Sequence, residues 1–208
     1  MRRTRNIALA LTALAFMAWA AHPAAAAALS GATGLLQIPT ADVLPDGQWR
    51  LAAGAAPDGL MPAVAYGPYP GFEIGVTAAG DNGLRLAAKY ALVSESASSP
   101  GLAIGMDGKT VYAVASRRVG SPGVRAHVGV AAGDEASLIA GVEARLRSVV
   151  VASADTPFGP PAVSLMADYD GRRAAAGARF DFAGGLELWA GYRQGDGVIA
   201  SVSYQTGF

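Results

Sequence analysis

The feature that most constrains the fold is a two-residue alternation of apolar and polar side chains, which recurs from Gln48 to the end of the chain. Leu138 and Val142 share one face of such a run, for example, and Glu143 and Arg145 share the other. Asp-Gly, Asn-Gly and Pro-Gly pairs separate the runs, and these pairs supply the backbone angles that tight hairpins need. The pattern predicts an all-β chain of antiparallel strands.

The expected strand number is about twelve, with about ten to fourteen allowed, because single-chain bacterial barrels use even numbers. Three of the candidate strands have weak patterns: Gly101–Met106, Thr110–Arg117 and Val149–Ser153. The alanine-rich runs favour helix in isolation, but the density of Gly and Pro turns argues against long helices.

The first 28 residues have the three-part layout of a secretory signal. Three arginines open the chain, Ile7–Ala20 is an uninterrupted apolar run, and Ala24–Ala28 offer small residues for cleavage. The apolar run has 14 residues, fewer than the ~20 that a membrane-spanning helix needs. We therefore predict a signal peptide over residues 1–28 that is cut after Ala26 or Ala28, and a retained anchor is the alternative.

Residues 29–47 follow this leader and show no clean period, although they contain several apolar residues, Gly and Pro. This composition predicts either a plug within or under the barrel, or a first strand. The barrel itself is predicted over residues 48–208.

Composition excludes several classes of function. The chain has no cysteine, which rules out disulfides, thiolate metal sites and a lipid anchor on a terminal Cys. His127 is the one histidine outside the leader, so we expect no zinc site and no cofactor. The leader holds three of the 16 basic residues and none of the 16 acidic ones, so its removal leaves a net charge of −3. A chain with this charge lacks the excess of basic residues that is typical of nucleic-acid-binding proteins.

No residue pattern points to an enzyme. The sequence contains no Gly-x-Ser-x-Gly motif, phosphate loop or metal-ligand spacing. Asp168 and Asp170 could suggest a carboxylate pair, but Asp170-Gly171 is better explained as a turn. We therefore predict a protein without catalytic, cofactor-binding or metal-binding residues.

Alternation alone does not decide which face points outward. A transmembrane barrel turns its apolar face to lipid, whereas a soluble barrel turns that face inward. Arg on the lipid side would cost roughly 2–4 kcal/mol at the midplane, so a membrane barrel must enclose its charges. The candidate lumen-facing charges are Arg50, Glu73, Arg85, Lys89, Arg125, Glu143, Arg145, Asp168, Arg173, Arg179, Asp181, Glu187 and Arg193.

The C-terminal run and the aromatic residues favour the membrane arrangement. The last run places Tyr204 and Phe208 on its apolar face and ends the chain with an aromatic residue, as in the assembly signal of outer-membrane barrels. Aromatic residues near strand ends are typical of the girdles at the two membrane interfaces. These residues are Tyr90, Tyr169, Phe180, Phe182, Tyr192, Tyr204 and Phe208.

Two stretches resemble a known family. Gly31–Gly47 (GATGLLQIPTADVLPDG), followed by Gln48–Ala55, is similar to the start of YjbH-type proteins. Pro161–Phe182, followed by Gly185–Leu188, resembles the strand, D/EYDG turn and alternating strand of the same family. Its members are outer-membrane barrel proteins linked to exopolysaccharide production and are usually longer. The resemblance implies a fold and a location, and it carries over no catalytic residue.

Together these observations predict a non-enzymatic barrel in the outer membrane of a Gram-negative envelope, which assists exopolysaccharide export or envelope organisation. The expected partners are outer-membrane lipid, the barrel-assembly machinery and polysaccharide-export proteins. The alternative is a soluble periplasmic or secreted β-barrel that binds an apolar ligand.

Overall fold

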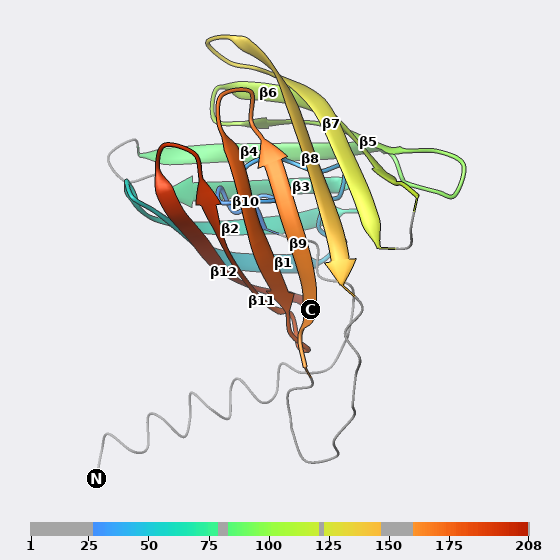
Figure 1. Ribbon diagram of the computed structural model, residues 1–208. Coiled ribbons are helices and arrows are strands. Elements are labelled where there is room, and N and C mark those ends of the chain that lie inside the picture. Colours follow the sequence, from blue (N-terminus) through green and yellow to red (C-terminus); the bar gives the residue numbers. More distant parts are fainter. Residues whose placement is uncertain (1–26, 79–82, 121–122, 147–159, 208) are drawn as a thin grey trace.

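The computed structural model describes residues 27–78, 83–120, 123–146 and 160–207, and these form a single closed barrel of twelve strands (Figure 1). The strands are β1 (Gln48–Ala56), β2 (Gly59–Tyr69), β3 (Phe72–Ala78), β4 (Leu84–Val93), β5 (Gly101–Asp107), β6 (Thr110–Arg118), β7 (Val124–Ala132), β8 (Ala136–Leu146), β9 (Ala162–Tyr169), β10 (Ala174–Asp181), β11 (Leu186–Arg193) and β12 (Gly197–Gly207).

Each strand pairs antiparallel with its neighbours in the sequence, and β1 closes the barrel against β12. In that seam Gln48 lies opposite Gly207, and Ala55 lies opposite Ala200. Closure leaves no strand edge unpaired, which a membrane requires because lipid offers backbone groups no hydrogen bonds. The predicted all-β antiparallel barrel of about twelve strands is therefore confirmed.

Two of the three weakly patterned runs are full strands: Gly101–Met106 lies in β5 and Thr110–Arg117 lies in β6. The third, Val149–Ser153, is outside the described residues. None of the described residues belongs to a helix that is long and apolar enough to cross a membrane.

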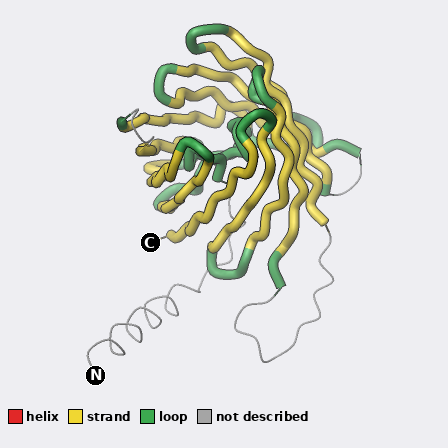
Figure 2. The backbone as a smooth tube through the Cα atoms, turned by 60° about the vertical axis from the view of Figure 1, so that its left-hand side comes forward, coloured by secondary structure: helices red, strands yellow, loops and turns green. Residues whose placement is uncertain are grey.

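The barrel has two distinct ends. We call the end where β1 begins and β12 ends the terminal end, and the opposite end, where β1 turns into β2, the turn end. Figure 2 shows the strands as a strongly curved wall with loops at both ends. Gly108 in the β5–β6 turn has a φ of 61°, a value that glycine adopts without steric cost.

The two faces of the wall differ as the membrane arrangement predicts. Leu84 and Val198 on the outer face are 75% and 71% exposed, whereas Arg50 and Lys89 on the inner face are 1% and 2% exposed. The alternative of a soluble barrel with its apolar face turned inward is therefore wrong for this wall.

Candidate functional site: the barrel lumen and its inner segment

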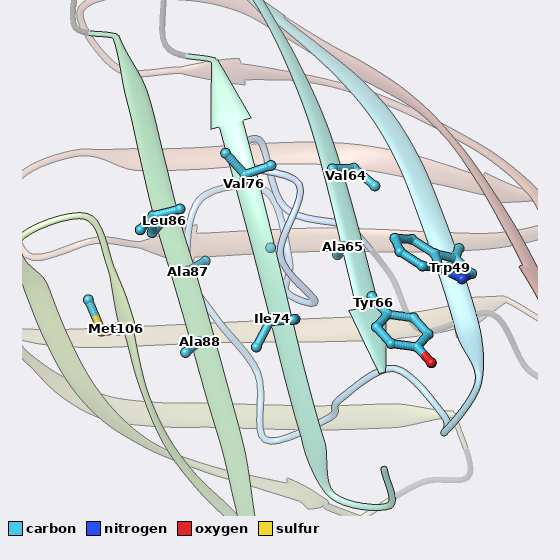
Figure 3. Close-up of a pocket in the computed structure, with 11 residues that line it drawn as sticks. Trp49, Val64, Ala65, Tyr66, Ile74, Val76, Leu86, Ala87, Ala88 and Met106 are labelled. Atoms are coloured by element: carbon cyan, nitrogen blue, oxygen red, sulfur yellow. The ribbon is translucent and has the colours of Figure 1, made fainter. Parts of the chain in front are cut away.

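Residues 27–47, which we call the inner segment, lie inside the barrel. Leu35, Leu36, Ile38 and Leu44 of this segment are each at most 1% exposed. In Figure 3 the pale blue chain passes behind β2–β4, on the side away from the outward-pointing side chains. Its only regular pairings among the described residues are two isolated bridges, so it is not a strand of the barrel.

Glycines on the wall make room for the inner segment. A Cβ atom on Gly67 would lie 2.2 Å from the carbonyl oxygen of Pro45, and one on Gly141 would lie 2.5 Å from Cδ1 of Leu35. Both distances are far below van der Waals contact. The inner segment can pack this closely because these wall positions carry no side chain.

Buried carboxylates of the wall bind the backbone of the inner segment. Glu73 on β3 accepts hydrogen bonds from the N–H and hydroxyl of Thr33 and, at 2.8 Å, from the N–H of Leu44. Asp168 on β9 accepts the N–H groups of Leu36 at 2.9 Å and Gln37 at 2.8 Å. Such charge-assisted bonds supply the partners that an irregular backbone needs when it is buried.

Asp168 also accepts the side-chain Nε2 of Gln37 at 3.0 Å and, at 3.4 Å, the N–H of Ile38. A hydroxyl plays the same part near the terminal end, where Ser116 Oγ accepts the N–H of Ala41 at 2.9 Å. The inner segment is thus held at several points by groups from well-separated strands.

Cations of the wall bind the carbonyl and carboxylate oxygens of the segment. Lys89 on β4 donates to the carbonyl oxygen of Thr33 and, at 2.9 Å, to that of Asp42. Arg125 on β7 donates from Nη2 to Oδ1 of Asp42 at 2.9 Å and from Nε to Glu95 at 2.7 Å.

The ionisation of Asp42 follows from these contacts. Burial by itself would raise the pKa of Asp42, but the hydrogen bonds and positive charge of Arg125, with the charge of Lys89, outweigh it. The pKa of Asp42 therefore lies below its usual range, and the carboxylate is charged at neutral pH.

Apolar packing fixes the segment against the other half of the wall. Leu29, Leu35, Leu36 and Ile38 form one buried cluster with wall residues that point inward from β8–β12. These wall residues are Ile139, Met166, Ala175, Trp189 and Ile199. The lumen therefore contains a small hydrophobic core of its own beside its charged part.

Several other predicted lumen charges form ion pairs, either with one another or with acids that were not predicted. Arg179 forms ion pairs with Glu143 and, at 3.2 Å, with Asp181. Near the turn end, Arg85 pairs with Asp107 at 2.6 Å and Arg193 with Asp196 at 2.6 Å.

Two residues predicted to be enclosed are exposed instead. Arg173 precedes β10 in the turn after β9, and Arg145 lies one residue before the end of β8. Alternation gives both residues the inward side, but at the barrel ends an inward side chain still reaches water.

Several lumen residues were not among the predicted ones. Asp42 and Thr33 lie in the aperiodic inner segment, where no pattern indicates the direction of a side chain. Ser116 and Asp107 occur in or beside the weakly patterned strands. Alternation within β6 and β5, which gives both residues the inward side, is the one sequence signal that could have identified them.

A cavity of about 260 Å³ remains between the inner segment and the wall. Gln37 lines it, and its buried Oε1 atom has no hydrogen-bond partner within the described part of the chain. The wall contributes mostly residues from the turn end, including Arg85, Asp107, Thr110 and Asp170. This cavity is small and polar on one side, so it suits water or a small polar solute.

Asp170, the other member of the carboxylate pair considered from the sequence, lies in the turn after β9. Its Oδ1 accepts the N–H groups of Arg172 and Arg173, both at 2.8 Å. The residues that the structure describes contain no group of three or more His, Asp or Glu side chains placed to hold a metal ion.

The outer face carries a groove of about 470 Å³ across β1–β5 (Figure 3). Its walls are apolar side chains, among them Trp49, Val64, Tyr66, Ile74, Leu86 and Met106. The groove belongs to the outward apolar surface, where acyl chains would fill it, and so it is not a solute site of the lumen.

Aromatic side chains gather on the outer face near the terminal end. Trp49 stacks on Tyr66 with ring centroids 4.2 Å apart, and Tyr69 stacks on Phe72 at 5.0 Å. The predicted residues Tyr90 and Phe180 are exposed at the same end, and Tyr169 and Tyr192 are exposed at the turn end. Phe182 follows β10, and Phe208 lies outside the described residues. The exposed rings match the interfacial girdles of membrane barrels.

Comparison with solved structures identifies the fold. A KdgM porin superimposes with a TM-score of 0.52 at 9% identity, over 77% of this chain and 99% of the porin. The chain has a porin fold. A second structure, described as KdgM porin in complex with disordered oligogalacturonate, gives a TM-score of 0.50 at 10% identity, over 77% and 99% of the two chains. At this identity the likeness concerns the fold alone.

No family model and no curated protein matches the sequence. The resemblance to YjbH-type proteins therefore stays a prediction. The outer-membrane location agrees with both the porin fold and the apolar outer surface, because strand-built membrane proteins of this kind belong to outer membranes.

Proposed function

We propose that this chain is an outer-membrane β-barrel whose lumen is closed by its own inner segment, and that it serves exopolysaccharide export or envelope organisation without catalysing a reaction. The observation that carries the proposal is the set of bonds that Glu73, Lys89, Ser116, Arg125 and Asp168 make to the inner segment. These five residues come from five different strands, so the segment is fastened around the lumen.

A closed resting state follows from these contacts. A solute that crosses the barrel must displace the inner segment, and this would break several charge-assisted hydrogen bonds and expose the apolar cluster around Leu36. Each bond to a charged group contributes about 1.5–3 kcal/mol. Thermal opening of the whole lumen is therefore rare, and transport would need a partner or a ligand that stabilises the open form.

The non-enzymatic character is supported by the state of the buried carboxylates. Glu73 and Asp168 each accept three or more hydrogen bonds from the inner segment. A buried carboxylate that is bound in this way to the inner segment is not directed at a substrate, so neither group is placed for acid–base catalysis.

The polysaccharide role is supported by the resemblance of Gly31–Gly47 and Pro161–Phe182 to YjbH-type proteins. The KdgM porin of the same fold is described in complex with oligogalacturonate, a sugar polymer fragment. In this chain Arg85, Arg125 and Arg179 are already paired with carboxylates, so an acidic sugar chain would find these cations neutralised. The proposal therefore places the polysaccharide with partner proteins rather than in the resting lumen.

The proposed partners are outer-membrane lipid along the apolar outer face, the barrel-assembly machinery and polysaccharide-export proteins. Recognition by the assembly machinery would use the last strand, β12, with Tyr204 on its outer face. Phe208, the second residue of that signal, is outside the described residues.

Cell fractionation tests the location. The protein is expected in the outer-membrane fraction, with a gel mobility that changes when the sample is heated, because a folded barrel resists detergent until it is boiled. Recovery in osmotic-shock fluid would refute the membrane assignment.

Planar-bilayer recording tests the closed lumen. We expect almost no steady conductance from the wild type, and frequent openings from a variant that lacks residues 30–46. A wild-type channel as conductive as the deletion variant would refute closure. The polysaccharide role is tested separately, because loss of the protein should reduce surface polysaccharide, and the wild-type chain should restore it.

A further inference from the structure

The start of the inner segment is bound at both its nitrogen and its oxygen. The main-chain nitrogen of Ala27 donates to Oε1 of Glu187 on β11 at 3.0 Å, and Nε1 of Trp189 donates to the Ala27 carbonyl oxygen at 2.8 Å. Ala27 is completely buried, and Glu187 is 2% exposed. Ala27, near the end of the predicted leader, is therefore hydrogen-bonded by Glu187 and Trp189, two inward-pointing residues of β11.

Glu187 has fewer hydrogen-bond donors than Glu73 and Asp168, the other wall carboxylates that bind the backbone of the inner segment. Glu73 accepts three hydrogen bonds, and Asp168 accepts four. Within the described part of the chain Glu187 accepts one, from Ala27, and its buried Oε2 atom has no partner. A buried carboxylate oxygen without a donor is costly, so this atom calls for a further donor near the nitrogen of Ala27.

The nearby arginines do not donate a hydrogen bond to Oε2 of Glu187. Arg50 on β1 and Arg179 on β10 act on Glu187 through their charges. Arg179, however, directs its guanidinium to Glu143 and Asp181, and Arg50 donates to Thr33 and Gln205. They stabilise the negative charge of Glu187 without supplying a hydrogen bond to Oε2.

We infer that the mature protein begins at Ala27 and that its α-ammonium group is bound by Glu187 inside the barrel. A backbone amide offers one N–H, whereas an ammonium group offers three and a full positive charge. With a free α-ammonium at Ala27, both oxygens of Glu187 can receive a donor. The site is thus a receptor for the processed N-terminus of the same chain.

The sequence supplies the matching cut. Ala24–Ala26 provide the small residues of a cleavage signal, and the cut after Ala26 was one of two predicted positions. Signal peptidase would hydrolyse the Ala26–Ala27 bond with one water molecule. The hydroxyl of the water joins the Ala26 carbonyl carbon, and the new carboxyl group loses its proton. The nitrogen of Ala27 takes up that proton and the remaining proton of the water, and so becomes an ammonium.

The other predicted position, after Ala28, would remove this arrangement. Without Ala27, Glu187 would lose its hydrogen-bond donor and Nε1 of Trp189 would lose its acceptor, both in the buried lumen. The contacts of Ala27 therefore favour cleavage after Ala26 over cleavage after Ala28, whereas the sequence favours neither.

Mass spectrometry of the protein from outer membranes gives the first test. The expected chain begins at Ala27 with an unmodified amine. A chain that begins at Leu29, or one that keeps the leader, would overturn the inference. This test depends on export but not on the polysaccharide role, so its failure is distinguishable from failure of the proposed function.

Amine labelling gives the second test, with the two lysines of the chain as internal references. Lys89 is buried and Lys109 is exposed. With an N-hydroxysuccinimide ester of acetate, the folded barrel should label rapidly at Lys109, and at least tenfold more slowly at Ala27 and Lys89. Labelling of the Ala27 amine as fast as Lys109 would overturn the inference.

The variant Glu187→Gln should speed labelling at Ala27 by at least tenfold and leave Lys89 protected. Glu143→Gln, which removes a lumen carboxylate that binds Arg179 instead, should leave Ala27 protected. Equal protection of Ala27 in Glu187→Gln and the wild type would count against the ion pair. If Glu187→Gln does not fold, the wild-type mass and labelling pattern still decide the matter.

Discussion

Substitution of Asp168 tests whether this carboxylate holds the inner segment inside the barrel. Replacing Asp168 by Ala removes the acceptor for the N–H groups of Leu36, Gln37 and Ile38, with donor distances of 2.9, 2.8 and 3.4 Å. Leaving a buried N–H without an acceptor costs about 1–3 kcal/mol. The two short bonds dominate, and water in the adjacent cavity can reach part of the site, so we expect a loss of about 3–5 kcal/mol for segment closure.

Asp168→Asn separates charge from hydrogen bonding at the same position. The amide oxygen of Asn can keep the bonds to Leu36 and Gln37, while its NH₂ group faces the side chain of Gln37. That side chain can turn so that its unpartnered Oε1 atom becomes the acceptor. The expected loss is therefore smaller, about 1–2 kcal/mol, from the weaker acceptor.

Hydrogen exchange measured by mass spectrometry reports the opening of the segment directly. Because each 1.4 kcal/mol is a factor of ten, Asp168→Ala should speed exchange in residues 30–47 by about 140- to 4,000-fold, and Asp168→Asn by about 5- to 30-fold. The barrel strands should keep their protection. Asp170→Ala is the matched control, since the bonds of Asp170 stay within its own turn. Wild-type exchange rates in Asp168→Ala would show that the carboxylate does not hold the segment.

Three further outcomes follow from the structure. Asp42→Asn should weaken closure by about 1 kcal/mol at neutral pH, as for a partly exposed ion pair with Arg125. The pKa of Asp42 is lower in the folded protein than in the unfolded chain. Its contribution is therefore complete above the unfolded pKa of about 4 and is lost as the pH falls through the lower folded pKa. The exchange rates of wild type and variant should converge in acid, and a difference that persists there would contradict the assignment. Gly67→Ala should destabilise closure by about 1–3 kcal/mol, because its Cβ would meet the carbonyl oxygen of Pro45, and unchanged exchange in the segment would show that the close approach is not needed. Val128→Arg, at the centre of the outer face of β7, should cost roughly 2–4 kcal/mol in urea titrations of the barrel in lipid vesicles, and a cost near zero would mean that this face does not contact lipid.

The local pattern was sufficient to predict the wall of the barrel. Alternation is a property of consecutive residues, so it assigns each side chain of a strand to one of two faces before any partner strand is known. The same rule placed Trp189 and Glu187 together on one face and Leu188 on the other, as the structure has them. The rule predicted that Arg145 and Arg173 are enclosed, and this was wrong, because alternation does not indicate how close a residue lies to the end of the barrel.

The site within the lumen depended on contacts between distant parts of the chain. The inner segment has no period, and the partner of each polar group is far away in sequence: Asp168 lies 131 residues from Gln37, and Glu187 lies 160 residues from Ala27. By itself the sequence determined the strands, the apolar outer face and a set of inward charges, since these follow from local chemistry and from the cost of placing charge in lipid. The tertiary structure decided which charges hold the inner segment, because closing β1 onto β12 brings those groups around one enclosed backbone whose N–H and C=O groups must all find partners.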